Sequence, residues 1–367
     1  RSRAGDGGRV AMRPIRRVTV VSENMGGVLD EGIRKFATGL LEGFRAHVEA
    51  SGVATSGGES SHPLVKSVPG SRLYTGRPLR REIESQRPEL VVYVPSASAT
   101  SFAFWRARML KRYAPGGQVA LVATQPRYHT ALGRLAASEM APDKVFAQSR
   151  ETIRYLEWLG MTPQFLPGGV DLQRFRPVTA EQKAALREEL GLPQDEYLVL
   201  HVGHLKPGRN VELLTRLGAI GTPVVVAGKS MGQDKELRQR LAESGVILID
   251  RYLRDVEIAY QACDAYLFPV REEDSAMDFP LSVLEAMACN LPVVAFPYGG
   301  LPLALESGGG LVFVESDEAM LSAIETVKRI PAATRQKAEP YAWERVAGRF
   351  LETMQGARDA ETYIRAV

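Results

Sequence analysis

Glu285 is the residue whose surroundings most clearly require a chemical partner. It lies in a segment, residues 265–300, in which an apolar strand leads into an acidic loop and then into a helix that begins near Pro280. Proline suits the first turn of a helix, and the free N–H groups of such a turn bind phosphate. An ionised glutamate among apolar neighbours is costly to bury alone. The partner is either a structural ion pair or the hydroxyls of a sugar or ribose, and the residues by themselves leave both open.

A basic turn follows another predicted strand in the same half of the chain. The segment 198–214 runs from an apolar strand into Gly203 and then places His204, Lys206 and Arg209 at the strand end. Gly203 permits a close approach of the backbone, and the basic side chains offer positive charge to an anion. The spacing is not that of a Walker loop. A solvated basic turn is the simpler interpretation of this segment taken alone.

Two glycines, Gly26 and Gly27, follow the first predicted strand and precede a helix. This is the place of a nucleotide-binding loop, but the Gly-x-Gly-x-x-Gly fingerprint is absent and the signal is weak. No group of His and Cys residues has the spacing of a zinc site. We therefore expect no metal.

The elements that must position these residues alternate along the whole chain. Continuous apolar strands separated by helices predict parallel sheets covered on both faces, and two such runs predict two doubly wound domains of the α/β class. In that architecture ligands bind at the carboxyl ends of the strands, here in the cleft between the domains. The predicted strands are 17–22, 90–94, 119–123, 145–147, 197–203, 223–227, 246–249, 265–269 and 292–296, and the predicted helices are 31–50, 102–113, 150–159, 210–217, 234–244, 255–262 and 281–289.

Length and composition agree with two globular domains. The chain has 367 residues, of which 45% are hydrophobic and 24% charged, and its two cysteines favour a reducing compartment. No apolar run reaches the length of a membrane span, and the first 17 residues lack the apolar core of a secretory signal, so we expect a cytoplasmic protein.

The two halves of the chain differ in charge. Residues 1–176 carry 26 Lys and Arg against 15 Asp and Glu (net +11), whereas residues 177–367 carry 20 against 28 (net −8). The basic half suggests an anionic partner.

Four motifs in order resemble the retaining glycosyltransferases of family four. The first two lie in 145–177, which passes from a strand through Ser149 into a helix, and then through a Gly-Val-Asp turn to a Phe-x-Pro exit. The third is LEAMACNLPVVAFPYGG (284–300), and the fourth is the closing helix YAWERVAGRFLETM (341–354). The resemblance implies the GT-B fold, in which two Rossmann-like domains face each other across a cleft. It implies an acceptor-side domain at 1–176, a nucleotide-sugar domain at 177–338, and a helix at 339–367 that crosses back onto the first domain.

The resemblance also assigns roles at the acidic loop. Glu285 matches the second of two glutamates eight positions apart, which holds the donor ribose in the family. The first glutamate falls on Met277, which has no carboxylate. Asp278 is adjacent, and we expect it to replace the missing group that steadies the donor sugar. Leu281 and Ser282 fall where backbone amides and a hydroxyl meet the donor phosphates.

Other positions match the family less closely. His204 and Arg209 fall on the two cations that neutralise the donor diphosphate, and because His204 stands where the family has arginine, Lys206 is expected to share the task. The remaining matches are Tyr252 and Leu253 at the edge that binds the base, Gly26 and Gly27 in the Gly-Gly loop, and Gln125, Arg127 and His129 as acceptor-side candidates for the family's first-domain histidine.

The resemblance implies a retaining hexosyltransferase that uses a nucleoside-diphosphate sugar. The Asp-x-Asp motif of metal-dependent glycosyltransferases is absent, so we expect a metal-independent reaction with no cofactor beyond the donor. A catalytically silent nucleotide-sugar-binding partner, and a sugar-nucleotide epimerase or phosphorylase on the same fold, are the alternatives.

The expected acceptor is a sugar, a lipid-linked molecule or another small compound, either anionic or neutral, and we expect no nucleic acid partner. Residues 101–113 mix aromatic and basic side chains. They fit a core helix with a solvated basic face better than a membrane contact, but peripheral binding of the basic domain to the inner membrane face stays open.

Overall fold

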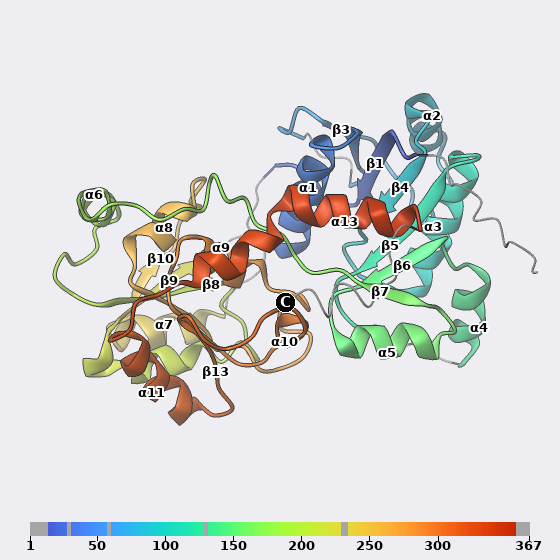
Figure 1. Ribbon diagram of the computed structural model, residues 1–367. Helices are drawn as coiled ribbons and strands as arrows, with labels where there is room; N and C mark the ends of the chain where they lie inside the picture. The colour runs from blue at the N-terminus through green and yellow to red at the C-terminus, as the bar shows by residue number, and fades with distance from the viewer. Residues whose placement is uncertain are drawn as a thin grey trace, which may run out of the picture.

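The computed structural model describes residues 14–27, 31–56, 60–127, 129, 131–228 and 234–356. Within these residues the chain forms two lobes, each built on one parallel sheet with helices on both faces (Figure 1). The predicted fold class is therefore observed. Residues 1–13 of the predicted first domain (1–176) and residues 357–367 of the predicted crossing helix (339–367) lie outside the described residues.

The first sheet has seven strands in the order β3-β2-β1-β4-β5-β6-β7, and all described pairs are parallel. The order reverses between β1 and β4, which is the switch point where ligands bind in such sheets. The strands are β1 (Arg17–Ser22), β2 (Glu49–Ala54), β3 (Val65–Ser67), β4 (Leu90–Tyr93), β5 (Gln118–Ala123), β6 (Lys144–Ala147) and β7 (Pro163–Phe165), and the helices are α1 (Gly32–Arg45), α2 (Arg77–Gln86), α3 (Ser101–Tyr113), α4 (Ala131–Glu139) and α5 (Arg150–Trp158).

The second sheet has six parallel strands in the order β10-β9-β8-β11-β12-β13, and its switch point lies between β8 and β11. Its strands are β8 (Leu198–Gly203), β9 (Thr222–Ala227), β10 (Ile247–Ile249), β11 (Ala265–Phe268), β12 (Val293–Ala295) and β13 (Leu311–Phe313). The helices of this part are α6 (Ala180–Leu190), η1 (Val211–Arg216), η2 (Gly218–Ile220), α7 (Lys235–Glu243), α8 (Glu257–Ala262), α9 (Leu281–Ala288), α10 (Leu301–Ala304), α11 (Asp317–Val327), α12 (Thr334–Ala338), η3 (Glu339–Tyr341) and α13 (Trp343–Met354).

Each predicted strand is present, and two predicted helices need correction. The helix predicted over 31–50 is wrong at its end, because α1 stops at Arg45 and residues 49–54 form β2 beside β1. This strand contains Gly52 and little apolar alternation, so its sequence carries no strand signal of its own; pairing with β1 on one side and β3 on the other makes it a strand. The helix predicted over 210–217 is a 3₁₀ helix.

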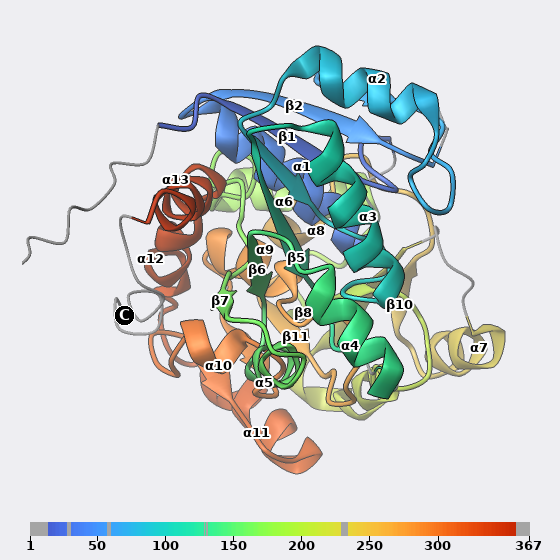
Figure 2. The same cartoon turned by 90° about the vertical axis from the view of Figure 1, so that its right-hand side faces the viewer.

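Alternating strand residues build two cores on opposite faces of each sheet. In the first sheet Val18 and Val20 face a core closed by α1 and α13, while Val21 faces a core closed by α2, α3 and α5. Figure 2 shows α3 and α4 on one side of this sheet and α13 on the other. The central strands β1, β4 and β5 are buried along almost their whole length, which is why they are nearly continuously apolar rather than alternating.

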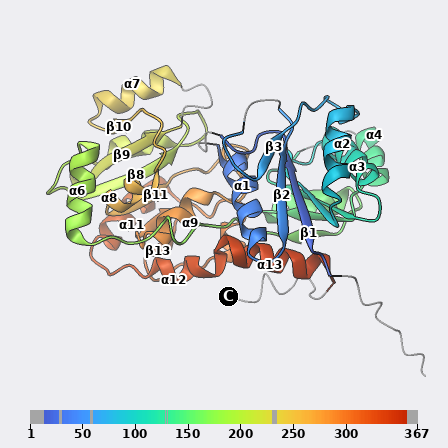
Figure 3. The same ribbon diagram turned by 90° about the horizontal axis from the view of Figure 1, so that it is seen from above.

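Helix α13 follows the second lobe in the sequence but packs against the first lobe. It passes along one side of both lobes and packs against α1 (Figure 3). Phe350 stacks on Phe146 of β6 with ring centroids 4.1 Å apart and meets the edge of Phe44 of α1 at 5.4 Å. At the start of α13, Trp343 covers Gly39 so closely that a Cβ there would lie 2.2 Å from the ring. The helix is thus part of the first core.

Replacing Phe350 by alanine should remove this anchor. The side chain is fully buried, so Phe350→Ala should lower the free energy of unfolding by about 3–5 kcal/mol. Urea unfolding followed by tryptophan fluorescence measures the loss. Ile330, 44% exposed, supplies the control, since Ile330→Ala should change stability by about 0.5 kcal/mol or less. A Phe350→Ala protein as stable as that control would show that α13 is not anchored through this ring.

Candidate functional site

The two lobes enclose a cavity of about 120 Å³ at the carboxyl ends of β8 and β11, which we call the Arg209 cavity. The cavity lies at the switch point of the second sheet and against the first turn of α9. It brings together seven residues singled out in the sequence and adds two, Gly32 and Lys35, from the first lobe. The seven are Gly203, His204, Arg209, Met277, Leu281, Ser282 and Glu285.

Arg209 is a half-buried guanidinium, and within the described part of the chain it has no counter-charge. Its Nε donates to the backbone oxygen of Ser275 at 2.8 Å, and no carboxylate among the described residues forms an ion pair with it. Burial lowers its pKa, but an arginine remains charged at neutral pH. The close approach of Arg209 also explains Gly203, because a Cβ at that position would lie 2.6 Å from Nη1. An unpaired buried cation of this kind is a site prepared for an anion.

Glu285 has the partner that its burial requires, and the partner comes from the other lobe. Lys35 of α1 donates from Nζ to Oε1 at 2.9 Å and to Oε2 at 3.3 Å. The hydroxyl of Tyr260, on α8, donates to Oε2 at 2.7 Å. The sequence left two partners open for Glu285, a structural ion pair or the hydroxyls of a sugar or ribose. The structure contains the ion pair.

Met277 is an apolar contact between the lobes. Its side chain is 8% exposed and belongs to the core cluster of the first lobe, against Gly32 of α1. A Cβ on Gly32 would lie 2.6 Å from the Met277 sulfur. The position of the family's first glutamate therefore contributes packing and no charge to the Arg209 cavity.

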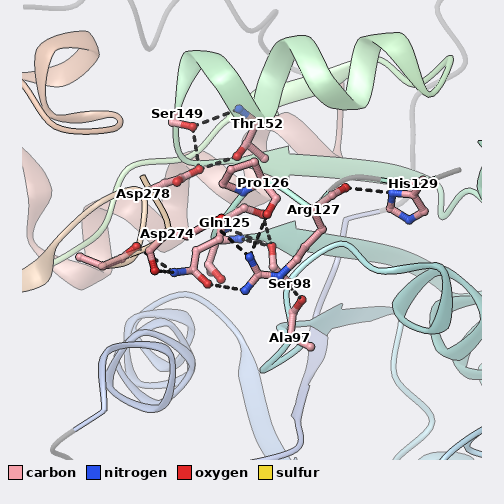
Figure 4. Close-up of polar contacts among 12 residues, drawn as sticks. Ala97, Ser98, Gln125, Pro126, Arg127, His129, Ser149, Thr152, Asp274 and Asp278 are labelled. Carbon is pink, nitrogen blue, oxygen red and sulfur yellow. Dashed lines mark hydrogen bonds and ion pairs between the residues drawn. The ribbon is translucent and has the colours of Figure 1, made fainter. Parts of the chain in front are cut away.

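Asp278 lies on the opposite side of the same segment from Met277. Its Oδ2 accepts hydrogen bonds from the hydroxyls of Ser149 at 2.6 Å and Thr152 at 2.5 Å, at the start of α5 (Figure 4). It lines a separate interlobe cavity of about 510 Å³ together with Arg150 and Arg271. Desolvation is the largest cause that raises the pKa of Asp278 to about 6, against the lowering effect of the two hydroxyls.

We expected Asp278 to steady the donor sugar in place of the glutamate that is missing at Met277. The observed location of Asp278, outside the Arg209 cavity, does not fit that role. Met277 lines the Arg209 cavity, whereas Asp278 lines the separate cavity of about 510 Å³ and not the Arg209 cavity. The backbone strengthens the arrangement: the Asp278 N–H donates to the oxygen of Thr124 at 2.9 Å, and its oxygen accepts from Gly300 at 2.7 Å.

Two of the three acceptor-side candidates contact the acidic loop of the other lobe. Gln125 donates from Nε2 to the oxygen of Ala276 at 2.8 Å, and Arg127 forms an ion pair with Asp274 at 3.1 Å (Figure 4). His129 instead bonds through Nδ1 with the oxygen of Arg127 and the hydroxyl of Tyr155. Desolvation lowers the pKa of His129, so its neutral form is favoured.

The remaining predicted residues lie around the Arg209 cavity. His204 is buried in it, and its Nδ1 bonds with the oxygen of Gly228 at 3.3 Å. Lys206 does not line this cavity. Tyr252 and Leu253 line an adjoining cavity of about 60 Å³, which we call the Tyr252 cavity.

The Gly-Gly loop adopts the backbone that only glycine accepts easily. Gly26 and Gly27 have φ of 74° and 76°, in the left-handed region, and neither residue lines the Arg209 cavity. The residue that reaches the cavity from this side is Lys35, further along in α1. Sequence reasoning missed Lys35 because a lysine in an amphipathic helix is normally solvated, and nothing local marks a partner 250 positions away.

No group of three or more His, Cys, Asp and Glu residues suited to a metal ion occurs in the part of the chain that the structure describes. Among these residues there is also no helix long and apolar enough to cross a bilayer.

Known structures with the same architecture are glycosyltransferases of the GT-B fold, which confirms the predicted fold. HepE of Anabaena in complex with UDP superimposes with a TM-score of 0.71 at 16% identity, covering 93% of this chain and 100% of that one. Sucrose-phosphate synthase of Thermosynechococcus elongatus gives 0.70 at 19% identity, covering 94% and 100%. At these identities the likeness concerns the fold.

Residues 197–328, most of the second lobe, match the family described as glycosyl transferases group 1, which confirms the resemblance inferred from the motifs. The D-inositol 3-phosphate glycosyltransferase of Geodermatophilus obscurus is 27% identical over 249 residues, which cover 59% of this chain and 53% of the relative. That of Mycobacterium tuberculosis strain H37Ra is 33% identical over 211 residues, covering 52% and 42%. The chain thus spans about half the length of the curated relatives it matches.

The raised pKa of Asp278 predicts a pH dependence of stability. The folded protein holds this proton up to about pH 6, whereas an unfolded aspartate releases it near pH 4. The wild type should therefore gain about 1 kcal/mol of unfolding free energy between pH 7 and pH 5 relative to Asp278→Asn, which keeps the acceptor oxygen but cannot titrate. Urea unfolding at both pH values measures this difference. Parallel pH profiles for the two proteins would mean that the carboxyl titrates normally.

Proposed function

We propose that this protein is a retaining hexosyltransferase that moves a sugar from a nucleoside-diphosphate sugar to a hydroxyl of a small acceptor. The observation that carries the proposal is Arg209, a half-buried cation that forms no ion pair with any described carboxylate and faces a cavity between two lobes at the switch point of a parallel sheet. The group 1 match of the second lobe supports it. HepE, which shares the fold, binds UDP and UDP-glucose in its solved structures.

The donor diphosphate fits the Arg209 cavity. Breaking the bond between the sugar and the diphosphate places an additional negative charge on the departing phosphate. Arg209 and the free N–H groups at the first turn of α9 meet that charge where it develops, and the Ser282 hydroxyl lies beside them. His204 contributes charge only in its protonated form. No metal or cofactor beyond the donor enters this proposal.

The nucleoside occupies the Tyr252 side of the cleft. Glu285 accepts the ribose hydroxyls, and the base lies along Tyr252 and Leu253 in the Tyr252 cavity, which also borders Gly203. The acceptor enters from the first lobe, and the departing phosphate oxygen takes the proton of its hydroxyl as the new bond forms on the same face of the sugar. That route requires no dedicated base.

The acceptor is proposed to be anionic or lipid-linked, because the net charge of +11 lies on the acceptor side. The first lobe also exposes Phe102 and Leu73 beside Arg72, whose guanidinium lies 4.6 Å from the Phe102 ring centre. Such a mixture of apolar and basic side chains suits a peripheral contact with the cytoplasmic face of a membrane.

A catalytically silent nucleotide-sugar-binding protein is the second candidate. Met277 favours it, because the carboxylate that steadies the donor sugar in the family is missing and Asp278 is held by Ser149 and Thr152 instead. An epimerase or a phosphorylase would also use this fold, so the reaction itself must be measured.

The test combines binding with product analysis. Thermal unfolding with UDP, GDP and ADP, and then with their sugars, should reveal one base that raises the melting temperature, since a ligand that binds only the folded state stabilises it. With that donor the protein should transfer the sugar with its anomeric configuration retained, as read by NMR of the product. Inversion would refute the retaining mechanism, binding without turnover would favour the silent partner, and no binding would refute the proposal.

Arg209 should matter more than His204. Arg209→Ala removes the permanent charge at the diphosphate and should lower kcat/KM by about 100-fold or more, whereas His204→Ala should lower it by about tenfold, because its charge depends on protonation. Steady-state kinetics with the donor identified above provide the comparison. Lys66→Ala, at a lysine of the first lobe that does not line the cavity, is the control and should retain activity. Equal or reversed effects of the first two variants would place the diphosphate elsewhere.

A further inference from the structure

Lys35 stands where three interlobe cavities meet. It lines the Arg209 cavity, the Tyr252 cavity and a third cavity of about 240 Å³ beside Trp343. Of the residues that line these cavities, Lys35 is the one common to all three. Each cavity alone is smaller than the roughly 300–1,000 Å³ of an ordinary ligand site. The Lys35 side chain, which is paired with Glu285, borders all three.

The two oxygens of Glu285 are already occupied. Tyr260 is completely buried in the same lobe as Glu285 and cannot leave without disrupting the core. Lys35 comes from the opposite lobe on a flexible four-carbon stem and its side chain is 21% exposed. If ribose hydroxyls are to bind Glu285, Lys35 is therefore the partner that must give way.

The displaced ammonium has a second place to go. Lys35 also lines the Arg209 cavity, where Arg209 is the permanently charged side chain from the second lobe. A nucleoside diphosphate carries at least two negative charges, which one guanidinium balances only in part. An ammonium from the first lobe supplies the other charge in that cavity, and it does so only when the lobes face each other.

We propose that Lys35 is a donor-site residue that exchanges partners: it holds Glu285 across the empty cleft, and it moves to the donor diphosphate when the ribose takes its place on Glu285. The inference rests on the proposed function, since it assumes a nucleoside-diphosphate donor in this cleft. If the exchange occurs, the Lys35 ammonium weakens the binding of a nucleoside, which has a ribose and no phosphate. The same ammonium strengthens the binding of a nucleoside diphosphate, which has both.

These opposite effects define the experiment. Lys35→Met keeps an unbranched side chain of nearly the same length and removes its charge. Binding is measured by isothermal titration calorimetry with the diphosphate among UDP, GDP and ADP that the wild type binds, and with the matching nucleoside. The variant should bind the nucleoside about tenfold more tightly, because no ammonium has to be displaced, and the diphosphate about tenfold more weakly, because a charge-assisted contact is lost. Lys35→Arg, which keeps the charge, should restore most of the diphosphate affinity.

Lys66→Met is the matched control. It makes the same chemical change in the same lobe, at an exposed lysine paired with Glu82, and should bind both ligands like the wild type. Circular dichroism and melting temperature confirm that each variant is folded. If the affinities of Lys35→Met for nucleoside and diphosphate do not change in opposite directions, the exchange is refuted. A wild type that binds none of the three diphosphates refutes the proposed function as well, whereas wild-type binding with an unaltered Lys35→Met refutes the exchange alone.

Discussion

The structure depends on one short segment that is shared by two hydrophobic cores. Met277 and Leu281 pack in the core of the first lobe, whereas Phe279 and Val283, between and after them, pack in the core of the second. Because the start of α9 is held in this way from both sides, the Arg209 cavity forms at the seam between the lobes. The site is thus a consequence of how the cores join.

This sharing also gives a physical meaning to the departure at Met277. A carboxylate at this position would be buried against Gly32 and the apolar core of the first lobe, so it would lose hydration and would depend on the cations of the Arg209 cavity as partners. Methionine fills the same irregular space with a flexible apolar chain. In this chain the position therefore forms an apolar contact between the lobes.

Charge is distributed so that the lobes recognise each other through a few specific pairs. Lys35 meets Glu285 and Arg127 meets Asp274, in each case a base of the first lobe and an acid of the second. These pairs follow the overall division of the chain into a basic and an acidic half. Since the second half is acidic, an anionic ligand there depends on individually placed groups such as Arg209 and not on a general positive potential.

The sequence by itself determined the two sheets and the cavity that contains Arg209 and Glu285. Buried parallel strands leave a strong local signal, since most of their residues are apolar, and the motifs that end them place these two residues at one edge of the sheet. Strand β2 left no such signal, because it depends on its neighbours in the sheet. Only the tertiary structure decided that Asp278 turns to α5 and that Lys35 reaches Glu285. Both follow from the direction of a side chain and the meeting of segments far apart in the chain, which local pattern does not encode.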